Sequence, residues 1–324
     1  MSDRTDPVPD LSTPDASGRL LDRLGLPPGT RALIVNADDF GMCHPANAAI
    51  AERLEDGGID SATVMVPCSW SPEALAFAAD RPGLDVGVHL VLTSEWRSYR
   101  WRPLTGTATS LVDAEGFFPS DVATVERTAD EADVAAEVAA QLAAALAAGV
   151  DVTHLDNHMG SVYGLETGRN FLAPVLELAA RHGLPFRLPR HPDGLGLDAA
   201  RAHALAAAVA AADALGVVVP DRLWTHPFEL RDEGTDHEER YEEVRDGYLR
   251  LLRALPPGVT ELYLHPMIDG EELRATVDFA AAKRGYEHRL LGDPMVASVL
   301  AEEGVVRIGW RALRAIQRGE RMPA

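Results

Sequence analysis

An apolar run ends in two adjacent carboxylates at Leu33-Ile34-Val35-Asn36-Ala37-Asp38-Asp39-Phe40-Gly41. The branched residues predict a buried strand, and Gly41 permits the chain to turn away sharply. Asp38 and Asp39 therefore lie at a strand-to-loop junction, where both can face one cleft. Neighbouring carboxylates repel each other unless a cation neutralises them or one holds a proton, so the pair predicts a metal or acid-base site. A turn with a helix cap is the structural alternative.

Apolar strands and helices alternate along the rest of the chain. Further strands are expected at residues 61–66, 85–93, 150–158 and 261–265. Helical patterns cover residues 45–55, 71–79, 129–148, 165–182, 198–215, 241–255 and 294–303. Repeated strand-then-helix units predict an α/β protein in which parallel strands form a (β/α) barrel. Residues 94–128 are expected to form a long loop, whose aromatic side chains either stack on a sugar ring or hold the loop onto the body.

Polar side chains stand at places where these strands should be apolar. His89 interrupts an apolar strand, a position where a core histidine is commoner than a ligand. His154, Asp156 and His158 recur at a spacing of two, which in a strand directs all three to one face. His265 ends the last of the apolar strands. In parallel barrels the reactive groups gather at the carboxyl ends of the strands, so these residues are expected to converge with the Asp pair.

The converging residues form a set of donors for a metal ion. One carboxylate with two imidazoles suits Zn²⁺ or another divalent first-row ion, and the second carboxylate remains free as a base. The same donors describe the facial triad of a non-haem Fe(II) oxygenase, and His154-Leu155-Asp156 has the compact spacing of such a triad. Repeated strand-then-helix units argue against the all-β barrel that those oxygenases favour.

The charge of the chain limits its partners. Its 324 residues include 50 acidic and 30 basic side chains, which give a formal net charge of -20. This charge argues against nucleic acid and against an anionic membrane, and favours a small neutral or cationic substrate. No apolar run is long enough to span a bilayer. A homodimer is a possible assembly.

The domain organisation follows from composition. Residues 1–30 are expected to form a flexible N-terminal tail without a signal peptide, and residues 31–324 a single domain. Cys43 and Cys68 are too few to build a disulfide framework. The cytoplasm is therefore the expected location.

Five segments together resemble the motifs of the YdjC-like carbohydrate deacetylases, in the order of that family and over most of residues 32–310. They are Asn36-Ala37-Asp38-Asp39-Phe40-Gly41, the strand from Ser61 to Pro67, Val86-Gly87-Val88-His89-Leu90-Val91-Leu92-Thr93, Thr153-His154-Leu155-Asp156-Asn157-His158 and Glu261-Leu262-Tyr263-Leu264-His265-Pro266. The resemblance implies a distorted (β/α) barrel of the polysaccharide-deacetylase-like type. It also implies a hydrolase that uses a divalent metal ion, Mg²⁺ or Zn²⁺, to remove acetyl groups from N-acetylated sugars such as chitooligosaccharides.

The resemblance also implies roles for individual residues. Asp39, His89 and His158 correspond to the metal ligands of the family. Asp38 corresponds to the general base, and His265 to the acid. The remaining expected site residues, which support the ligands or bind the substrate, are His154, Asp156 and Arg187.

One motif departs from the family pattern. Members usually continue the fourth motif with further histidines, whereas this chain has Asn157-His158-Met159-Gly160-Ser161. The expected ligand is retained, but the groove beyond it has fewer hydrogen-bonding groups. A sugar-binding protein that has lost catalysis is the last alternative, and the five intact residues of the expected metal and acid-base groups argue against it.

Overall fold

The computed structural model describes residues 15–230 and 239–320. Its sheet has seven strands in the order β4-β3-β2-β1-β6-β5, with β7 paired to β1, and every pair is parallel. The strands are β1 (Arg31–Phe40), β2 (Ser61–Val64), β3 (Asp85–Leu90), β4 (Leu155–Asn157), β5 (Arg222–Trp224), β6 (Gly258–Leu264) and β7 (Val306–Arg307). The parallel sheet confirms the α/β prediction.

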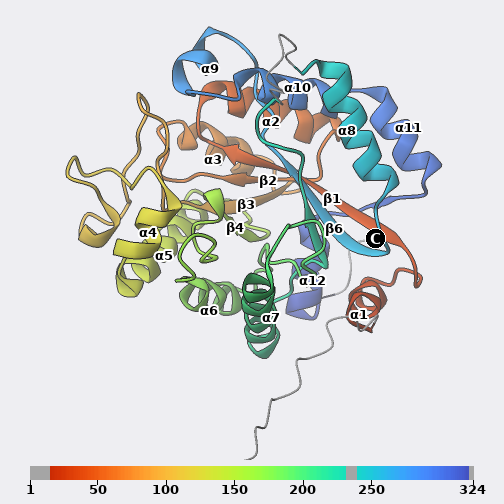
Figure 1. Ribbon diagram of the computed structural model, residues 1–324, viewed down its shortest axis with the longest axis horizontal. Helices are drawn as coiled ribbons and strands as arrows, with labels where there is room; N and C mark the ends of the chain where they lie inside the picture. The colour runs from red at the N-terminus through yellow and green to blue at the C-terminus, as the bar shows by residue number, and fades with distance from the viewer. Residues whose placement is uncertain (1–14, 231–238, 321–324) are drawn as a thin grey trace, which may run out of the picture.

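Helices surround this sheet (Figure 1). They are α1 (Asp15–Arg23), α2 (His44–Asp56), α3 (Ser71–Ala79), α4 (Val122–Thr128), α5 (Glu131–Ala147), α6 (Leu172–His182), α7 (Ala199–Ala214), α8 (Tyr241–Arg253), α9 (Glu271–Thr276), α10 (Ala281–Leu291), α11 (Pro294–Glu302) and α12 (Trp310–Arg318). Short 3₁₀ turns lie at Thr109–Leu111 and His158–Gly160. Of the described residues, no helix is both long enough and apolar enough to cross a membrane.

Two irregular segments join the ends of the curled sheet. The backbone N–H of Leu155 in β4 donates to Pro185, and that of Phe186 donates to Val218. The N–H of Asp221 in turn donates to Val259 in β6. The hydrogen bonds therefore continue around the sheet through residues 184–191 and 217–221. This arrangement is the distorted (β/α) barrel that the sequence predicted.

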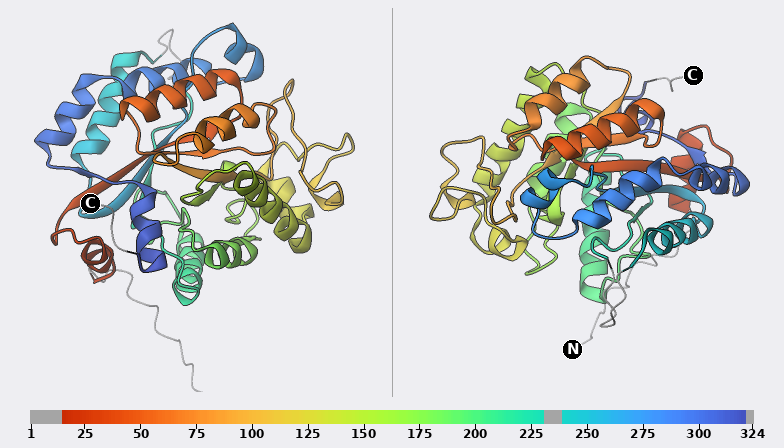
Figure 2. Two further views of the ribbon diagram at one scale, coloured as in Figure 1. Left: turned by 180° about the vertical axis from the view of Figure 1, so that it is seen from behind. Right: turned by 90° about the horizontal axis from the view of Figure 1, so that it is seen from above.

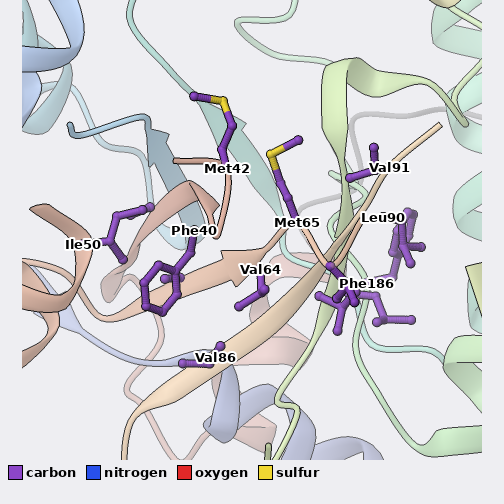
Figure 3. Close-up of a cluster of buried hydrophobic side chains, with 14 of the residues drawn as sticks. Phe40, Met42, Ile50, Val64, Met65, Val86, Leu90, Val91 and Phe186 are labelled. Atoms are coloured by element: carbon purple, nitrogen blue, oxygen red, sulfur yellow. The ribbon is translucent and has the colours of Figure 1, made fainter. Parts of the chain in front are cut away.

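Alternate side chains of β1 pack into two separate apolar clusters. Leu33, Val35 and Ala37 belong to the large core between the sheet and its helices, which also includes Ile50 of α2. Figure 3 shows part of this core, with Phe40, Val64, Val86 and Phe186 among its labelled side chains. The alternate residue Ile34 packs with Trp310 in a second cluster, which lies at the amino end of the strands.

Part of the segment expected to be a flexible tail is folded. Residues 1–14 lie outside the described part, but Asp15–Arg23 forms helix α1. Leu20, Leu21 and Leu24 are buried in the second cluster with Trp310 of α12. The two helices lie side by side beside the start of β1 (Figure 2). The apolar side chains of α1 therefore hold residues 19–24 against the barrel, and the expected tail boundary at residue 30 is wrong.

Candidate metal centre

Asp39 lies at the end of β1 in a backbone conformation that few residues adopt. Its φ is 68°, in the left-handed region, which is costly for a residue with a side chain. Its side chain is fully buried, and Oδ2 accepts a hydrogen bond from Arg284 at 3.0 Å. The other oxygen, Oδ1, is buried and has no hydrogen-bond partner. An unpaired buried carboxylate oxygen is unfavourable unless a cation binds there.

Two imidazoles face this oxygen. His158 Nδ1 lies 3.4 Å from Asp39 Oδ1, and His89 Nε2 lies 3.7 Å from it. The two ring nitrogens are 3.3 Å apart. All three side chains are buried and together form a group that could hold a metal ion. A tetrahedral ion with ligand distances of about 2.0–2.1 Å separates its ligand atoms by about 3.4 Å. Asp39 Oδ1, His89 Nε2 and His158 Nδ1, which we call the ligand triangle, therefore fit a divalent ion of this size.

Carboxylates orient both imidazoles. His89 Nδ1 is 2.7 Å from Asp156 Oδ1, and His158 Nε2 is 3.0 Å from Glu95 Oε2. Each histidine therefore uses one nitrogen to hold its ring and turns the other toward Asp39, the arrangement usual for metal-binding histidines. Burial alone would lower the pKa of His158, but Glu95 and Asp39 raise it to about 10. The site is thus built to hold positive charge next to Asp39.

Asp38 is directed away from this triangle by a guanidinium. Arg187 binds both of its carboxylate oxygens, each at 2.7 Å, and the amide of Asn36 donates to Oδ1 at 2.8 Å. Burial acts to raise the pKa of Asp38, but Arg187 and then His89 outweigh it, and the pKa falls to about 2. Asp38 is therefore ionised at neutral pH, with Oδ2 4.0 Å from His89 Nε2.

His265 lies across from Asp38 at the end of β6. Its Nε2 is 4.0 Å from Asp38 Oδ2, and its backbone N–H donates to Glu287 at 2.7 Å. Glu287 is held by the ammonium of Lys283 at 2.6 Å and by the hydroxyl of Tyr248 at 2.6 Å. Burial lowers the pKa of His265 below its usual value, so its imidazole is neutral at pH 7.

A second group of potential ligands is already neutralised. Asp38, His89 and Asp156 also lie close enough together to share an ion. However, Arg187 pairs with Asp38 at 2.7 Å and with Asp156 at 2.8 Å. Arg187 thus binds both carboxylates of the second group, whereas Arg284 binds only one oxygen of Asp39 and leaves Oδ1 without a hydrogen-bond partner. The group around Asp39 is therefore the better metal site.

Arg187 also reaches a third carboxylate, Glu261 of β6. The distance from Arg187 to Glu261 is 2.8 Å, and the indole of Trp310 donates to the same oxygen at 3.3 Å. Burial raises the pKa of Glu261 to about 7. One buried guanidinium thus joins β1, β4 and β6 beneath the candidate metal group.

The structure separates the three residues that the sequence placed on one face of a strand. Asp156 and His158 contact His89, but β4 covers only Leu155–Asn157. His154 stacks on Trp310, with ring centroids 4.5 Å apart and planes 4° apart. Gly87 provides the space for this ring, because an added Cβ would lie 2.6 Å from it.

The position of His154 has two consequences. It is absent from the cavity lining and from both groups that could hold a metal. Its expected role at the ligands or the substrate is therefore corrected to one in the packing of the barrel. The compact spacing of His154-Leu155-Asp156 is likewise no facial triad, because His154 and Asp156 do not meet at one ion.

The candidate metal group opens into a cavity of about 550 Å³. Asp38, Asp39, His89, His158 and His265 all line it. The strand ends that the sequence predicted to converge therefore meet at a single cavity. Its volume lies within the range of about 300–1,000 Å³ that is typical of small-molecule sites.

Sequence reasoning missed three polar residues of this site. Glu95 lies in the long loop before α4, and Arg284 and Glu287 lie on α10. Their contacts to His158, Asp39 and the backbone of His265 depend on side chains far apart in sequence. The one available signal was spacing, because Lys283, Arg284 and Glu287 recur at helical intervals on an otherwise alanine-rich and polar segment.

The fold and the site define a class of protein. It is an α/β protein with a distorted barrel of parallel strands and a buried Asp-His-His group at the carboxyl ends of the strands. The model of the YdjC-like protein family matches residues 32–302, and the chain belongs to this family.

Two relatives match nearly the whole chain. A carbohydrate deacetylase of Thermus thermophilus is 36% identical over 296 residues, which cover 91% of this chain and 98% of the relative. A carbohydrate deacetylase of Geobacillus stearothermophilus is 30% identical over 282 residues, or 87% and 97% of the two chains. A crystal structure of a putative cellobiose-phosphate cleavage protein from Enterococcus faecalis V583 superposes with a TM-score of 0.69 at 23% identity, covering 88% of this chain and 99% of that chain. This last similarity supports the fold alone.

Proposed function

We propose that this protein is a metal-dependent hydrolase that removes an acetyl group from an N-acetylated sugar. The observation that carries the proposal is the unpaired Oδ1 of Asp39, which faces two oriented imidazoles inside a substrate-sized cavity. The names of the two full-length relatives support the carbohydrate substrate. Asp39, His89 and His158 would hold the ion. When bound, a divalent ion supplies Lewis-acid activation of the acetyl carbonyl and of water.

Asp38 is the proposed general base. It is ionised, lines the cavity and lies next to the ligand triangle without belonging to it. Water loses a proton to Asp38 as its oxygen forms a bond to the acetyl carbon, and the C–N bond of the amide then breaks. Arg187 keeps Asp38 charged and fixed in position, which favours a defined geometry at the cost of basicity.

His265 is the proposed proton donor to the departing amine. An amide nitrogen leaves only when it is protonated, so the reaction needs a donor beside the base. The lowered pKa of His265 implies that it is neutral before substrate binds. It therefore takes up the proton that Asp38 removes from water and passes it to the amide nitrogen, or it donates its N–H to the oxygen that becomes negative. His265 Nε2 lies 4.0 Å from Asp38 Oδ2, which lets a proton pass from one to the other through the reacting groups.

The donor set favours zinc over magnesium. Imidazole ligands suit Zn²⁺ and other first-row ions, whereas Mg²⁺ takes carboxylates, phosphates and water. Metal analysis of the purified protein tests this choice, with one equivalent of a first-row ion as the expected result. A cytoplasmic location and a homodimer stay predictions of the sequence.

Acetate release under anaerobic conditions tests the proposed activity. The metal-loaded protein is incubated with N-acetylglucosamine, its oligomers and O-acetylated sugars, and free acetate is measured. Release from N-acetylated sugars without oxygen is expected. Product formation that requires oxygen would instead support an oxygenase. Binding of sugars with no product under either condition would indicate a sugar-binding protein without catalysis.

A further inference from the structure

The two imidazoles of the ligand triangle are oriented from different parts of the protein. Asp156, which holds His89, is fully buried on strand β4. Glu95, which holds His158, lies outside the helices and strands, in the segment that follows β3. The sheet therefore fixes one of the two rings, whereas the position of the other depends on how this segment packs.

His158 stands at a strained turn. The next residue, Met159, has a φ of 54°, in the left-handed region that is unfavourable for a residue with a side chain. Contacts from outside the turn therefore have to hold it, and two of them come from the segment after β3. Glu95 Oε2 lies 3.0 Å from His158 Nε2, and the hydroxyl of Thr93 donates to the sulfur of Met159 at 3.4 Å.

Residues 95–99, which we call the strap, pack against the turn that follows β1. The buried indole of Trp96 donates to the sulfur of Met42 at 3.4 Å, and the hydroxyl of Tyr99 donates to the carbonyl of Met42 at 2.6 Å. These aromatic side chains hold the loop onto the body of the protein. Because Met42 follows closely after Asp39, the strap contacts the chain that carries one potential ligand while its own carboxylate reaches another.

The strap has a second anchor on the segment before α10. The backbone N–H of Arg97 donates to Asp278 at 2.9 Å, and the rings of Trp96 and Phe279 lie 4.9 Å apart. Arg97 and Ser98 at its centre are exposed, and no helix or strand includes them. Exposed segments that are held by a few contacts open locally at a small part of the free energy of global unfolding. The strap can thus leave the site while the sheet stays folded.

We infer that Glu95 is a positioning residue of the candidate metal centre, and that metal binding and docking of the strap stabilise each other. Glu95 holds His158 with Nδ1 toward Asp39, and it does so only while the strap is docked. Such a coupling is reciprocal: the factor by which docking raises the affinity for the ion equals the factor by which the ion favours docking. The inference rests on the metal site of the proposed function, but not on the reaction.

Hydrogen exchange in the full-length wild-type protein tests the coupling. Exchange of the amides of residues 95–99 is followed by mass spectrometry with and without saturating Zn²⁺. We expect Zn²⁺ to slow it at least about tenfold, by the reciprocity of the coupling. Residues 104–108 of the same loop are the control, because Leu104 and Thr105 bond to Glu137 of α5 instead, and their exchange should not change. Strap exchange that ignores bound Zn²⁺ would overturn the inference.

Variants of Glu95 test its part. Glu95→Ala should lower the affinity for Zn²⁺, measured by competition with a chelator, about 10–100-fold, and Zn²⁺ should no longer slow exchange in the strap. Glu95→Gln keeps an acceptor for the ring without the charge and should lie between Glu95→Ala and the wild type. Arg97→Ala is the matched control on the strap, because this side chain is 86% exposed and its hydrogen bond to Asp278 is made by the backbone. Wild-type affinity in Glu95→Ala would overturn the inference.

A remote variant separates docking from the contact to the ring. Asp278→Ala removes the acceptor of the strap, yet Asp278 neither lines the cavity nor belongs to a group that could hold a metal. It should speed exchange in the strap and lower the affinity for Zn²⁺ by at least about threefold, because docking and binding are coupled. Faster exchange with unchanged affinity would overturn the coupling.

Failure of the proposed function can be separated from failure of this inference. If the wild type binds no first-row ion, the metal-dependent hydrolase and this inference are both wrong. Zn²⁺ binding that is the same in Glu95→Ala overturns this inference alone. Binding that is coupled to the strap, without acetate release from any sugar, supports this inference and contradicts the proposed reaction.

Discussion

The Nδ1 atom of His89 lies 2.7 Å from Oδ1 of Asp156, a residue of the neighbouring strand β4. Asp156 is itself held by the hydroxyl of Thr63 at 2.9 Å and by Arg187 at 2.8 Å. These contacts leave the imidazole one orientation, in which Nε2 faces Asp39. The position of one potential ligand is therefore fixed by three residues that do not touch the metal position.

Removal of either histidine should abolish metal binding. His89→Ala and His158→Ala each delete one corner of the triangle, so we expect less than a tenth of an equivalent of metal to remain after dialysis. Asp156→Asn should retain the ligands but weaken affinity by about 10–100-fold, because it loosens the orientation of His89. Metal content and affinity are measured by mass spectrometry and by competition with a chelator. His203→Ala, on the exposed side of α7, is the control, and full metal retention in His89→Ala would refute the assignment.

Asp38→Asn should keep the metal and lose turnover. The substituted amide has nearly the same shape but cannot accept a proton, so kcat should fall by about 100-fold or more. Steady-state acetate release and metal content are measured on the same preparation. If metal and activity are lost together, Asp38 is a ligand rather than a base. Unchanged kcat would remove it from the mechanism.

His265→Ala should distinguish amide from ester substrates. An amide needs a proton for its leaving nitrogen, whereas an ester with an acidic alcohol does not. Cleavage of an N-acetyl sugar is therefore expected to drop at least about 100-fold, while an activated acetate ester should react almost as fast as with the wild type. Equal loss on both substrates would indicate stabilisation of the oxyanion instead. No loss on either would show that His265 has no part in the reaction.

The ion pair beneath His265 should contribute strongly to stability. Lys283, the only lysine in the chain, is buried against Glu287. Lys283→Met leaves the buried carboxylate without its cation, so we expect the free energy of unfolding in urea to fall by about 3–5 kcal/mol.

Two further variants test this explanation. Lys283→Met/Glu287→Gln should recover part of the loss, because the neutral amide still accepts from the backbone of His265. Arg274→Ala breaks an exposed pair with Asp269 and should have little effect. A double variant no more stable than Lys283→Met would contradict the electrostatic explanation.

The contribution of Asp151 to the free energy of unfolding should depend on pH in a defined direction. Hydrogen bonds from Arg314 and Arg311 lower the pKa of Asp151 to about 2, compared with about 3.9 in an unfolded chain. The folded state thus favours the ionised form. The stabilisation is present above about pH 4 and is lost as the pH falls from about 4 toward 2.

Urea unfolding of wild type and Asp151→Asn at several pH values tests this expectation. The difference in stability should be constant between pH 7 and pH 5 and should narrow below about pH 4. A difference that persists unchanged to pH 3 would mean that the contribution of Asp151 does not come from its charge.

The sequence by itself determined the strands and what stands at their ends. The apolar run before Asp38, the histidine within the third strand and the histidine after the last long strand are local patterns, and parallel barrels bring such ends together. It also determined the family, because the motifs occur in order along one chain. These features depend on neighbouring residues, so they can be predicted without coordinates.

The tertiary structure decided which polar groups meet. His154 and His158 look equivalent in sequence, yet one stacks on Trp310 and the other faces Asp39. The reason is their place along the chain: His154 precedes the short strand β4 and packs on α12, whereas His158 follows that strand, at the end where the candidate metal group lies. Long-range contacts likewise decided the roles of Glu95 and Glu287, because burial makes a polar side chain bind whichever partner the fold brings within reach.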